Sequence, residues 1–132
     1  MANDRSTPAL ELFDHTEELR VDLEWLKKMA ALAMPHCLEA KGTEKPVLPE
    51  LEVVEVSLIS DEEIARVHGE FMDDPTATDV ITFHHGEVLV SIDTAERVGP
   101  EHQHTTVVEA LLYVIHGFLH LNGHTDSSEP ER

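Results

Sequence analysis

Hydrophobic and polar residues alternate along this chain with two different periods, and the changes of period mark out its secondary structure. Stretches with a period of two, rich in Val, Ile and Leu, predict strands. They lie at residues 10–13, 51–59, 79–83 and 87–92. Stretches with apolar residues three and four positions apart predict helices. These lie at residues 22–41, 60–71, 93–98 (a short helical turn) and 101–122.

The order of these elements, β-α-β-α-β-β-α-α, predicts an α/β (α+β) fold with a small mixed sheet of about four strands packed with helices. Residues 84–86 join two strands as a hairpin, so part of the sheet is expected to be antiparallel. Pro35 is expected to kink or divide the first long helix. The length predicts one domain, residues 1–132, in which the polar residues 1–8 are expected to be frayed.

The last helix, residues 101–122, carries a polar sector on an otherwise apolar surface. Projected at about 100° per residue, its apolar side chains form a broad arc. The arc consists of Val107, Val108, Leu111, Leu112, Val114, Ile115, Phe118, Leu119 and Leu121. The remaining sector contains Glu109, Tyr113, His116 and His120. Because an unpaired polar group in a buried helix is costly, this grouping indicates a functional site.

His116 and His120 in this sector have the spacing of metal ligands. Two histidines four residues apart lie on one face of a helix, where both imidazoles reach the same ion. Gly123 then ends the helix in a left-handed turn, and Asp126 follows as a third ligand. Two helical ligands and one from the next turn leave a coordination position open, which is typical of a catalytic zinc site with one ion per chain.

The general base of such a site is not identified by the sequence. In the HExxH motif a glutamate follows the first histidine, but here that position is Gly117. Glu109, two turns before His116, is a candidate for a hydrogen bond to an imidazole N–H of the site, with a solvated acid as the alternative. The catalytic residues therefore remain open.

The charge of the chain narrows the range of partners. Nine Lys and Arg residues against 27 Asp and Glu give a formal net charge of −18, which repels nucleic acid at long range. An RNA substrate would need a local positive patch, a metal ion or a partner that already holds the RNA. No apolar run of about 18 residues and no signal peptide is visible, and the lone Cys37 cannot form an internal disulfide. A cytoplasmic protein without membrane contact is expected.

Four segments of the chain resemble the YbeY family, in the order in which that family has them. The segment HGFLHLNGHTD is similar to the family signature HGxLHLxGYDH. Upstream, SDEEIARVHGEF resembles the family's acidic helix, ATDVITF its PTDVLSF strand and GEVLVSIDTA its GDIxISxxxA strand. The resemblance covers the chain from about Leu10 onward.

This resemblance implies the family's compact fold, in which a sheet packed with helices surrounds a metal cleft. It also implies a zinc-dependent endoribonuclease that is specific for single strands and acts in rRNA processing and ribosome biogenesis. Its implied role includes 3′-end maturation of small-subunit rRNA. The implied partners are single-stranded or ribosomal RNA and the small ribosomal subunit, not DNA.

Two departures from the family pattern concern the site. His116 and His120 match the first two zinc ligands, but the family's third ligand is His where this chain has Asp126. His124, where the family has Tyr, is the rival third ligand, and Asp126 is favoured because it keeps the family spacing. The second departure is Met72, at a position where the family often has an Arg that can clamp phosphate.

Three functions are compatible with these observations. The first is the metal-dependent endoribonuclease. The second is a non-catalytic ribosome-assembly factor that zinc stabilises, which the acidic composition and Met72 favour. The third is a zinc hydrolase with a different substrate, because a metal site alone does not identify one.

Overall fold

The computed structural model describes residues 7–18 and 20–125 of the chain. Within these residues there are four strands, four α-helices and two short 3₁₀ helices, η2 and η3. Their bounds are β1 Ala9–Asp14, α1 Leu23–Glu39, η2 Leu48–Glu50, β2 Val53–Ile59, α2 Asp61–Met72, β3 Val80–Phe83, β4 Glu87–Ser91, α3 Ile92–Val98, η3 Gly99–His102 and α4 Thr106–Leu121. The predicted order of strands and helices is confirmed.

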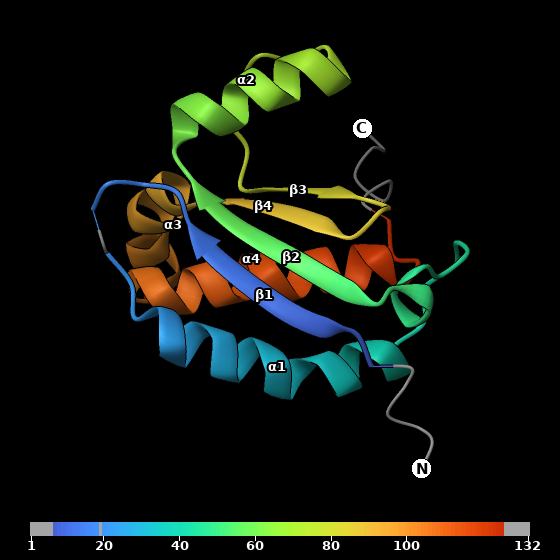
Figure 1. Cartoon of the computed structure of the whole chain (residues 1–132). Coiled ribbons are helices and arrows are strands. Elements are labelled where there is room, and N and C mark those ends of the chain that lie inside the picture. Colours follow the sequence, from blue (N-terminus) through green and yellow to red (C-terminus); the bar gives the residue numbers. More distant parts are fainter. Residues whose placement is uncertain (1–6, 19, 126–132) are drawn as a thin grey trace.

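The four strands form one mixed sheet in the order β1-β2-β4-β3 (Figure 1). β1, β2 and β4 are parallel, and β3 pairs antiparallel with β4 at the edge of the sheet. The connection from β1 to β2 contains α1, since parallel neighbours need a long crossover. The predicted α+β fold with a small mixed sheet is therefore confirmed.

Two long helices cover one face of the sheet and build the main core. α1 packs against α4, and α4 contacts both β3 and β4 (Figure 1). Alternate side chains of β2 and β4 point into this layer, as a period of two requires. They are Val54, Val56, Leu58, Val88 and Val90. Phe118 of α4 is the largest side chain that is fully buried here.

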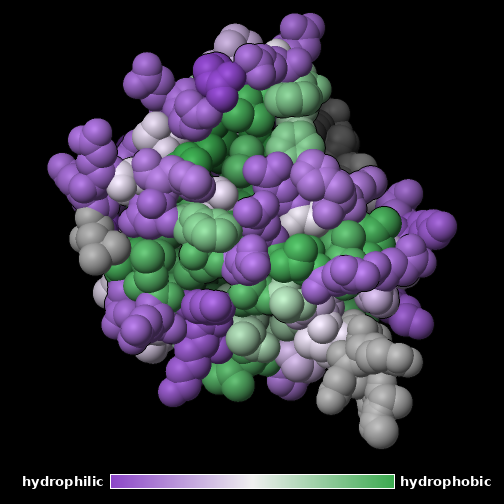
Figure 2. All heavy atoms as spheres, viewed as in Figure 1, coloured by the Kyte–Doolittle hydropathy of each residue, from purple (hydrophilic) through white to green (hydrophobic). Residues whose placement is uncertain are grey.

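α2 covers part of the opposite face. Its Ile64 and Val67 pack in a second, smaller cluster with Ile59, Ile81 and Leu89 of the sheet. A groove of about 1050 Å³ lies between this helix and the sheet. Figure 2 shows hydrophilic side chains over most of this side of the molecule, with hydrophobic side chains visible between them. Hydrophilic side chains thus cover much of the surface even where the sheet lacks a full helical cover.

α1 differs from its prediction at Pro35. The helix continues from Leu23 to Glu39 through this proline, so it is not divided there, and the alternative, a kink, stays a prediction. Proline has no N–H to donate, but Ala31 and Pro35 are exposed, so water can hydrate the Ala31 carbonyl that lacks this donor. None of the helices in the described part of the chain is both long and apolar enough to cross a membrane.

α4, the histidine helix, begins later than predicted. Thr105 caps it by accepting a hydrogen bond from the Val108 N–H at 3.4 Å. Residues 99–102 form η3 instead, and Gln103 between the two helices has a left-handed φ of 64°. This conformation interrupts the helical path, so the chain enters α4 from a different direction.

The buried face of α4 also differs from the predicted arc. Leu112 is 45% exposed, whereas Glu109 and Tyr113 of the polar sector are buried. The reason is the position of the helix: Gly117 and Phe118 face the sheet and the main core, which turns Leu112 outward. The polar sector is therefore split between a buried part and an exposed part.

The segment expected to be frayed, residues 1–8, falls mostly outside the described residues, since the description begins at Thr7. Pro8, however, is buried. β1 begins directly after it, where the Ala9 N–H donates to the Glu52 carbonyl at 2.9 Å. The expected fraying therefore does not extend to Pro8.

Candidate metal centre

His116 and His120, the histidine pair, lie one turn apart on α4 with their rings together. Their Nε2 atoms are 3.1 Å apart, and the ring centroids are 4.8 Å apart. Two ligands that bind one tetrahedral zinc ion at about 2.0–2.1 Å lie roughly 3.4 Å from each other. The two nitrogens therefore fit a shared ion. His116 is exposed and His120 half-buried, so an ion there can be reached from solvent.

Gly117, between the two histidines, is where α4 approaches the sheet. A Cβ atom at this position would lie 2.8 Å from Val88 Cγ1 and 3.1 Å from Thr82 Cγ2. Both neighbours belong to the sheet, and Val88 is fully buried. A glutamate, as in HExxH, would meet the sheet here and could not act as general base for the pair.

The end of α4 is fastened to the end of α1. The Asn122 side-chain amide is buried and donates to the carbonyls of Cys37, Leu38 and Ala40 at 2.9, 3.2 and 3.2 Å. Gly123 follows with a φ of +100°, as the sequence predicts. A Cβ at Gly123 would lie 2.4 Å from the Glu44 carbonyl oxygen. These contacts fix the turn that leads from the histidine pair to Asp126.

Of the two candidates for the third ligand, the structure describes only His124. His124 directs its Nε2 to the Ala40 carbonyl oxygen at 2.7 Å, across the junction with α1. Asp126 lies outside the described residues. The choice of His116, His120 and Asp126 as the metal ligands therefore remains a prediction.

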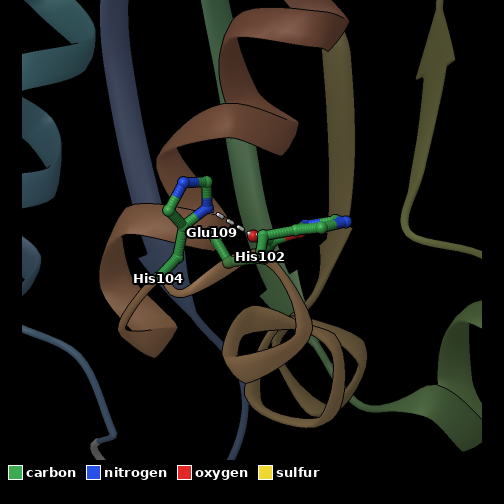
Figure 3. Close-up of side chains that lie close together, drawn as sticks. All are labelled: His102, His104 and Glu109. Carbon is green, nitrogen blue, oxygen red and sulfur yellow. Dashed lines mark hydrogen bonds and ion pairs between the residues drawn. The ribbon is translucent and has the colours of Figure 1, made fainter.

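A second group of ligand-type residues, the His/Glu cluster, surrounds the start of α4. It consists of His102, His104 and Glu109, whose side chains converge in Figure 3. His102 Nδ1 lies 3.0 Å and His104 Nδ1 2.8 Å from the nearer Glu109 oxygens. One ligand atom from each residue lies within 4.8 Å of the others, so the cluster could hold a metal ion.

The charge of Glu109 is stabilised inside this cluster. The residue is only 1% exposed. Burial opposes its ionisation, but hydrogen bonds from His104 and His102 outweigh burial, and the pKa of Glu109 lies below its usual value. The imidazoles that Glu109 bonds at these distances are those of His102 and His104. Its predicted bond to an imidazole of the histidine pair stays a prediction.

Tyr113, one turn after Glu109, lies between the two histidine groups. Burial and then a hydrogen bond with the Glu109 carboxylate raise the pKa of its hydroxyl. The hydroxyl therefore remains protonated at neutral pH and is no candidate for a general base. It connects the buried carboxylate with the surface on which His116 lies.

Sequence reasoning missed His102 and His104. Within a helix that began at residue 101 they would point to different sides, because positions two apart do not share a face. Instead, the left-handed Gln103 and the Thr105 cap fold the segment back over Glu109. Thr105 is the signal that could have revealed them, because threonine is a favoured N-cap residue. A helix that starts after Thr105 leaves both histidines outside the helix.

A cleft of about 380 Å³, the α4 cleft, opens between these groups. It is lined by Tyr113 and His116 of α4, by His102 of η3 and by Arg97 of α3. Met72, which replaces the family's frequent Arg, is not among the described residues that line it. A guanidinium nevertheless lies at this cleft, from a different element.

Comparison with known proteins identifies the family of this chain. The family model described as Endoribonuclease YbeY matches residues 11–132. A relative of that name from Heliobacterium modesticaldum is 29% identical, over 89% of this chain and 80% of its own length. One from Chlamydia muridarum is 27% identical, over 98% and 82%.

Shorter alignments reach higher identity. A relative named Endoribonuclease YbeY from Nautilia profundicola is 36% identical over 58% of this chain and 63% of its own length. The chain thus spans less than two thirds of that relative. A solution structure from Thermotoga maritima has a TM-score of 0.56 at 23% identity, covering 93% of this chain and 78% of that one, which shows a shared fold. On the match of the family model to all but the first residues, this chain belongs to the YbeY family.

Proposed function

We propose that this chain is a zinc-dependent endoribonuclease that cleaves single-stranded RNA. Its substrate would be ribosomal RNA, including the 3′ end of small-subunit rRNA, and its partner the small ribosomal subunit in the cytoplasm. The proposal treats residues 1–132 as one domain that binds one zinc ion.

The histidine pair is the observation that carries this proposal. Its Nε2 atoms converge to 3.1 Å, His116 lines the α4 cleft, and Asn122 fastens the end of the helix just after the pair. The core that α4 builds does not use these two imidazoles, since His116 is exposed and His120 only half-buried. Relatives named endoribonuclease support the same reaction class.

His116, His120 and Asp126 would hold the ion. Two histidines and a carboxylate form a ligand set that zinc hydrolases use, with a fourth position left for water. A zinc ion bound there would act as a Lewis acid and would lower the pKa of its bound water to about 7. Asp126 is preferred to His124 because the Nε2 of His124 is engaged by the Ala40 carbonyl.

The residues around the ion have different tasks. Gly117 lets α4 lie directly on Val88 and so fixes the height of the histidine pair above the sheet. Asn122 and Gly123 hold the following turn against α1. Tyr113, protonated, closes the α4 cleft next to His116 without offering a base.

The experiment combines metal analysis with RNA cleavage. Purified wild-type protein is expected to contain about one zinc and to cleave a single-stranded RNA oligonucleotide but not the matching duplex. The His116→Ala, His120→Ala double variant is expected to lose both the zinc and the cleavage. His36→Ala removes an exposed histidine from α1 and serves as the matched control. Undiminished cleavage by the metal-free double variant would contradict the proposal.

The acidic composition supports a second candidate function, that of a non-catalytic ribosome-assembly factor. A net charge of −18 disfavours independent RNA binding, and a zinc ion at the end of α4 would reinforce the junction with α1. This candidate predicts that the protein copurifies with the small subunit and restores rRNA processing only with an intact metal site. Purified protein would then show no cleavage of its own.

A further inference from the structure

The α4 cleft is a difficult place for a polyanion, because the chain around it is acidic. Asp79 lines it on the side of β3, and the buried Glu109 lies at its floor. The carboxylate of Glu109 is engaged by the two imidazoles that bond it, whereas Asp79 is exposed at the cleft edge. An RNA phosphate would therefore be repelled at the β3 side.

Arg97 lies on the α3 side of the same cleft. Among the described residues that line the cleft, it is the one with a permanent positive charge. Its side chain is 59% exposed, so part of the guanidinium can be reached from the cleft. The two sides of the cleft thus differ: the β3 side presents a carboxylate, and the α3 side presents a partly exposed guanidinium that can bind phosphate.

The guanidinium of Arg97 is also held in position. Its Nη1 donates to Asp61 Oδ2 at 2.8 Å and its Nη2 to Thr94 Oγ1 at 3.3 Å. Asp61 is itself fixed, since the hydroxyls of Ser91 and Thr94 donate to its Oδ1 at 2.6 Å each. A guanidinium has five N–H donors, and these two bonds leave others for a ligand. An arginine that is already ordered loses less conformational entropy when it binds an anion.

We propose that Arg97 binds a backbone phosphate of single-stranded RNA, next to the phosphodiester held at the histidine pair. The inference rests on the proposed function and names a substrate contact for it. The RNA strand would enter the α4 cleft along α3, with one phosphate on Arg97 and the adjoining one near His116. Arg97 is thus a substrate-binding residue, and the acid at Asp79 restricts the strand to this path.

The test compares three variants of the zinc-loaded protein. Arg97→Ala is expected to raise KM for a single-stranded RNA about tenfold, as loss of one charge-assisted contact does. The slope of log kcat/KM against log salt should become shallower by about 0.7. Arg97→Lys should recover most of the KM and the slope, and zinc content should equal that of wild type in both.

Arg66→Ala is the matched control. Arg66 is an exposed arginine that, like Arg97, pairs with acids, here Glu63 and Glu70, but it lines the groove beneath α2 and not the α4 cleft. Its removal changes the net charge by the same amount. It is expected to leave KM and the salt slope close to the wild-type values.

Three results would overturn the inference. One is an unchanged KM and salt slope in Arg97→Ala. Another is an equal loss in Arg97→Ala and Arg66→Ala, which would show only the effect of net charge. The third is a fall in kcat and melting temperature in both Arg97→Ala and Arg97→Lys at constant KM. That result would show that Arg97 stabilises the fold through its bond to Asp61 and does not bind substrate.

Failure of the proposed function is a separate outcome. If zinc-loaded wild type does not cleave RNA, binding of a fluorescein-labelled single-stranded RNA is measured by anisotropy for wild type and Arg97→Ala. Weaker and less salt-dependent binding by Arg97→Ala supports the phosphate contact without the reaction. Equal binding, or no binding by wild type, overturns it.

Discussion

The histidine pair and the His/Glu cluster use the same residue type near opposite ends of α4, yet their surroundings differ. The exposed His116 and the half-buried His120 face each other through Nε2 near the end of the helix. His102 and His104 face a carboxylate that is 1% exposed, through Nδ1, at the beginning of the helix. The first group brings two imidazole nitrogens together, whereas the second surrounds a carboxylate with imidazole nitrogens.

This difference separates metal binding from structural stabilisation. With the proton of each neutral ring on Nδ1, both Nε2 atoms present lone pairs, and a cation between them would be bound by both. A buried carboxylate already has the donors that it needs. We therefore expect zinc at the histidine pair, and expect the His/Glu cluster to hold the η3 segment against α4 by hydrogen bonds.

Metal content should distinguish the two groups most strongly. His120→Ala removes a proposed ligand, and zinc affinity is expected to fall by more than the roughly 10–100-fold that loss of a ligand's hydrogen-bond partner causes. His104→Ala is expected to keep about one zinc per chain. The measurement is zinc content by mass spectrometry after dialysis against a chelator. Two zinc ions in wild type, with one lost in His104→Ala, would show that the cluster also binds metal.

The free energy of unfolding should depend more on the His/Glu cluster than on the histidine pair. Glu109→Ala leaves two imidazole donors facing a cavity, and we expect the free energy of unfolding to fall by about 1–3 kcal/mol. His116→Ala, measured on metal-free protein, should change it little because His116 is exposed. Urea denaturation of both variants provides the measurement, with Glu101→Ala, an exposed acid on η3, as control. A Glu109→Ala protein as stable as wild type would contradict the structural role of the cluster.

The sequence alone predicts one of these two groups well. The histidine pair follows from local spacing, because residues four apart on a helix meet whatever the rest of the fold is. The four strands also follow from local alternation, and all are found in the structure. Such features depend on few distant contacts.

The His/Glu cluster could not be predicted in the same way. It depends on the left-handed conformation of Gln103, which moves the start of α4 from residue 101 to Thr106. The buried face of α4 depends likewise on tertiary packing, since Gly117 against Val88 determines that Leu112 points outward. Arg97 reaches the cleft only because α3 lies against α4. Long-range contacts of this kind leave no periodic pattern.

The effect of pH should further separate the two groups. Because the pKa of Glu109 in the folded protein lies below its usual value of 4.5, its charge stabilises the fold above that pH. The stabilisation is lost as the pH falls from 4.5 through the lowered pKa. Wild type should therefore lose stability more steeply than Glu109→Gln in this acidic range, by urea midpoints. Parallel curves for the two proteins, with Glu101→Gln as reference, would show that Glu109 does not contribute in this way.

The smallest expected effect tests whether Tyr113 couples the two groups. Tyr113→Phe removes the hydroxyl that hydrogen-bonds with Glu109 and keeps the buried ring, so the free energy of unfolding should fall by about 0.5–1.5 kcal/mol. In a double-mutant cycle with Glu109→Gln, the two losses should not add, because both variants disturb the same hydrogen bond. Zinc affinity should remain that of wild type, since the proposed ligands His116, His120 and Asp126 do not include this hydroxyl. A weaker zinc site in Tyr113→Phe would instead show that the buried carboxylate acts on the pair through Tyr113, and the two groups would then be one site.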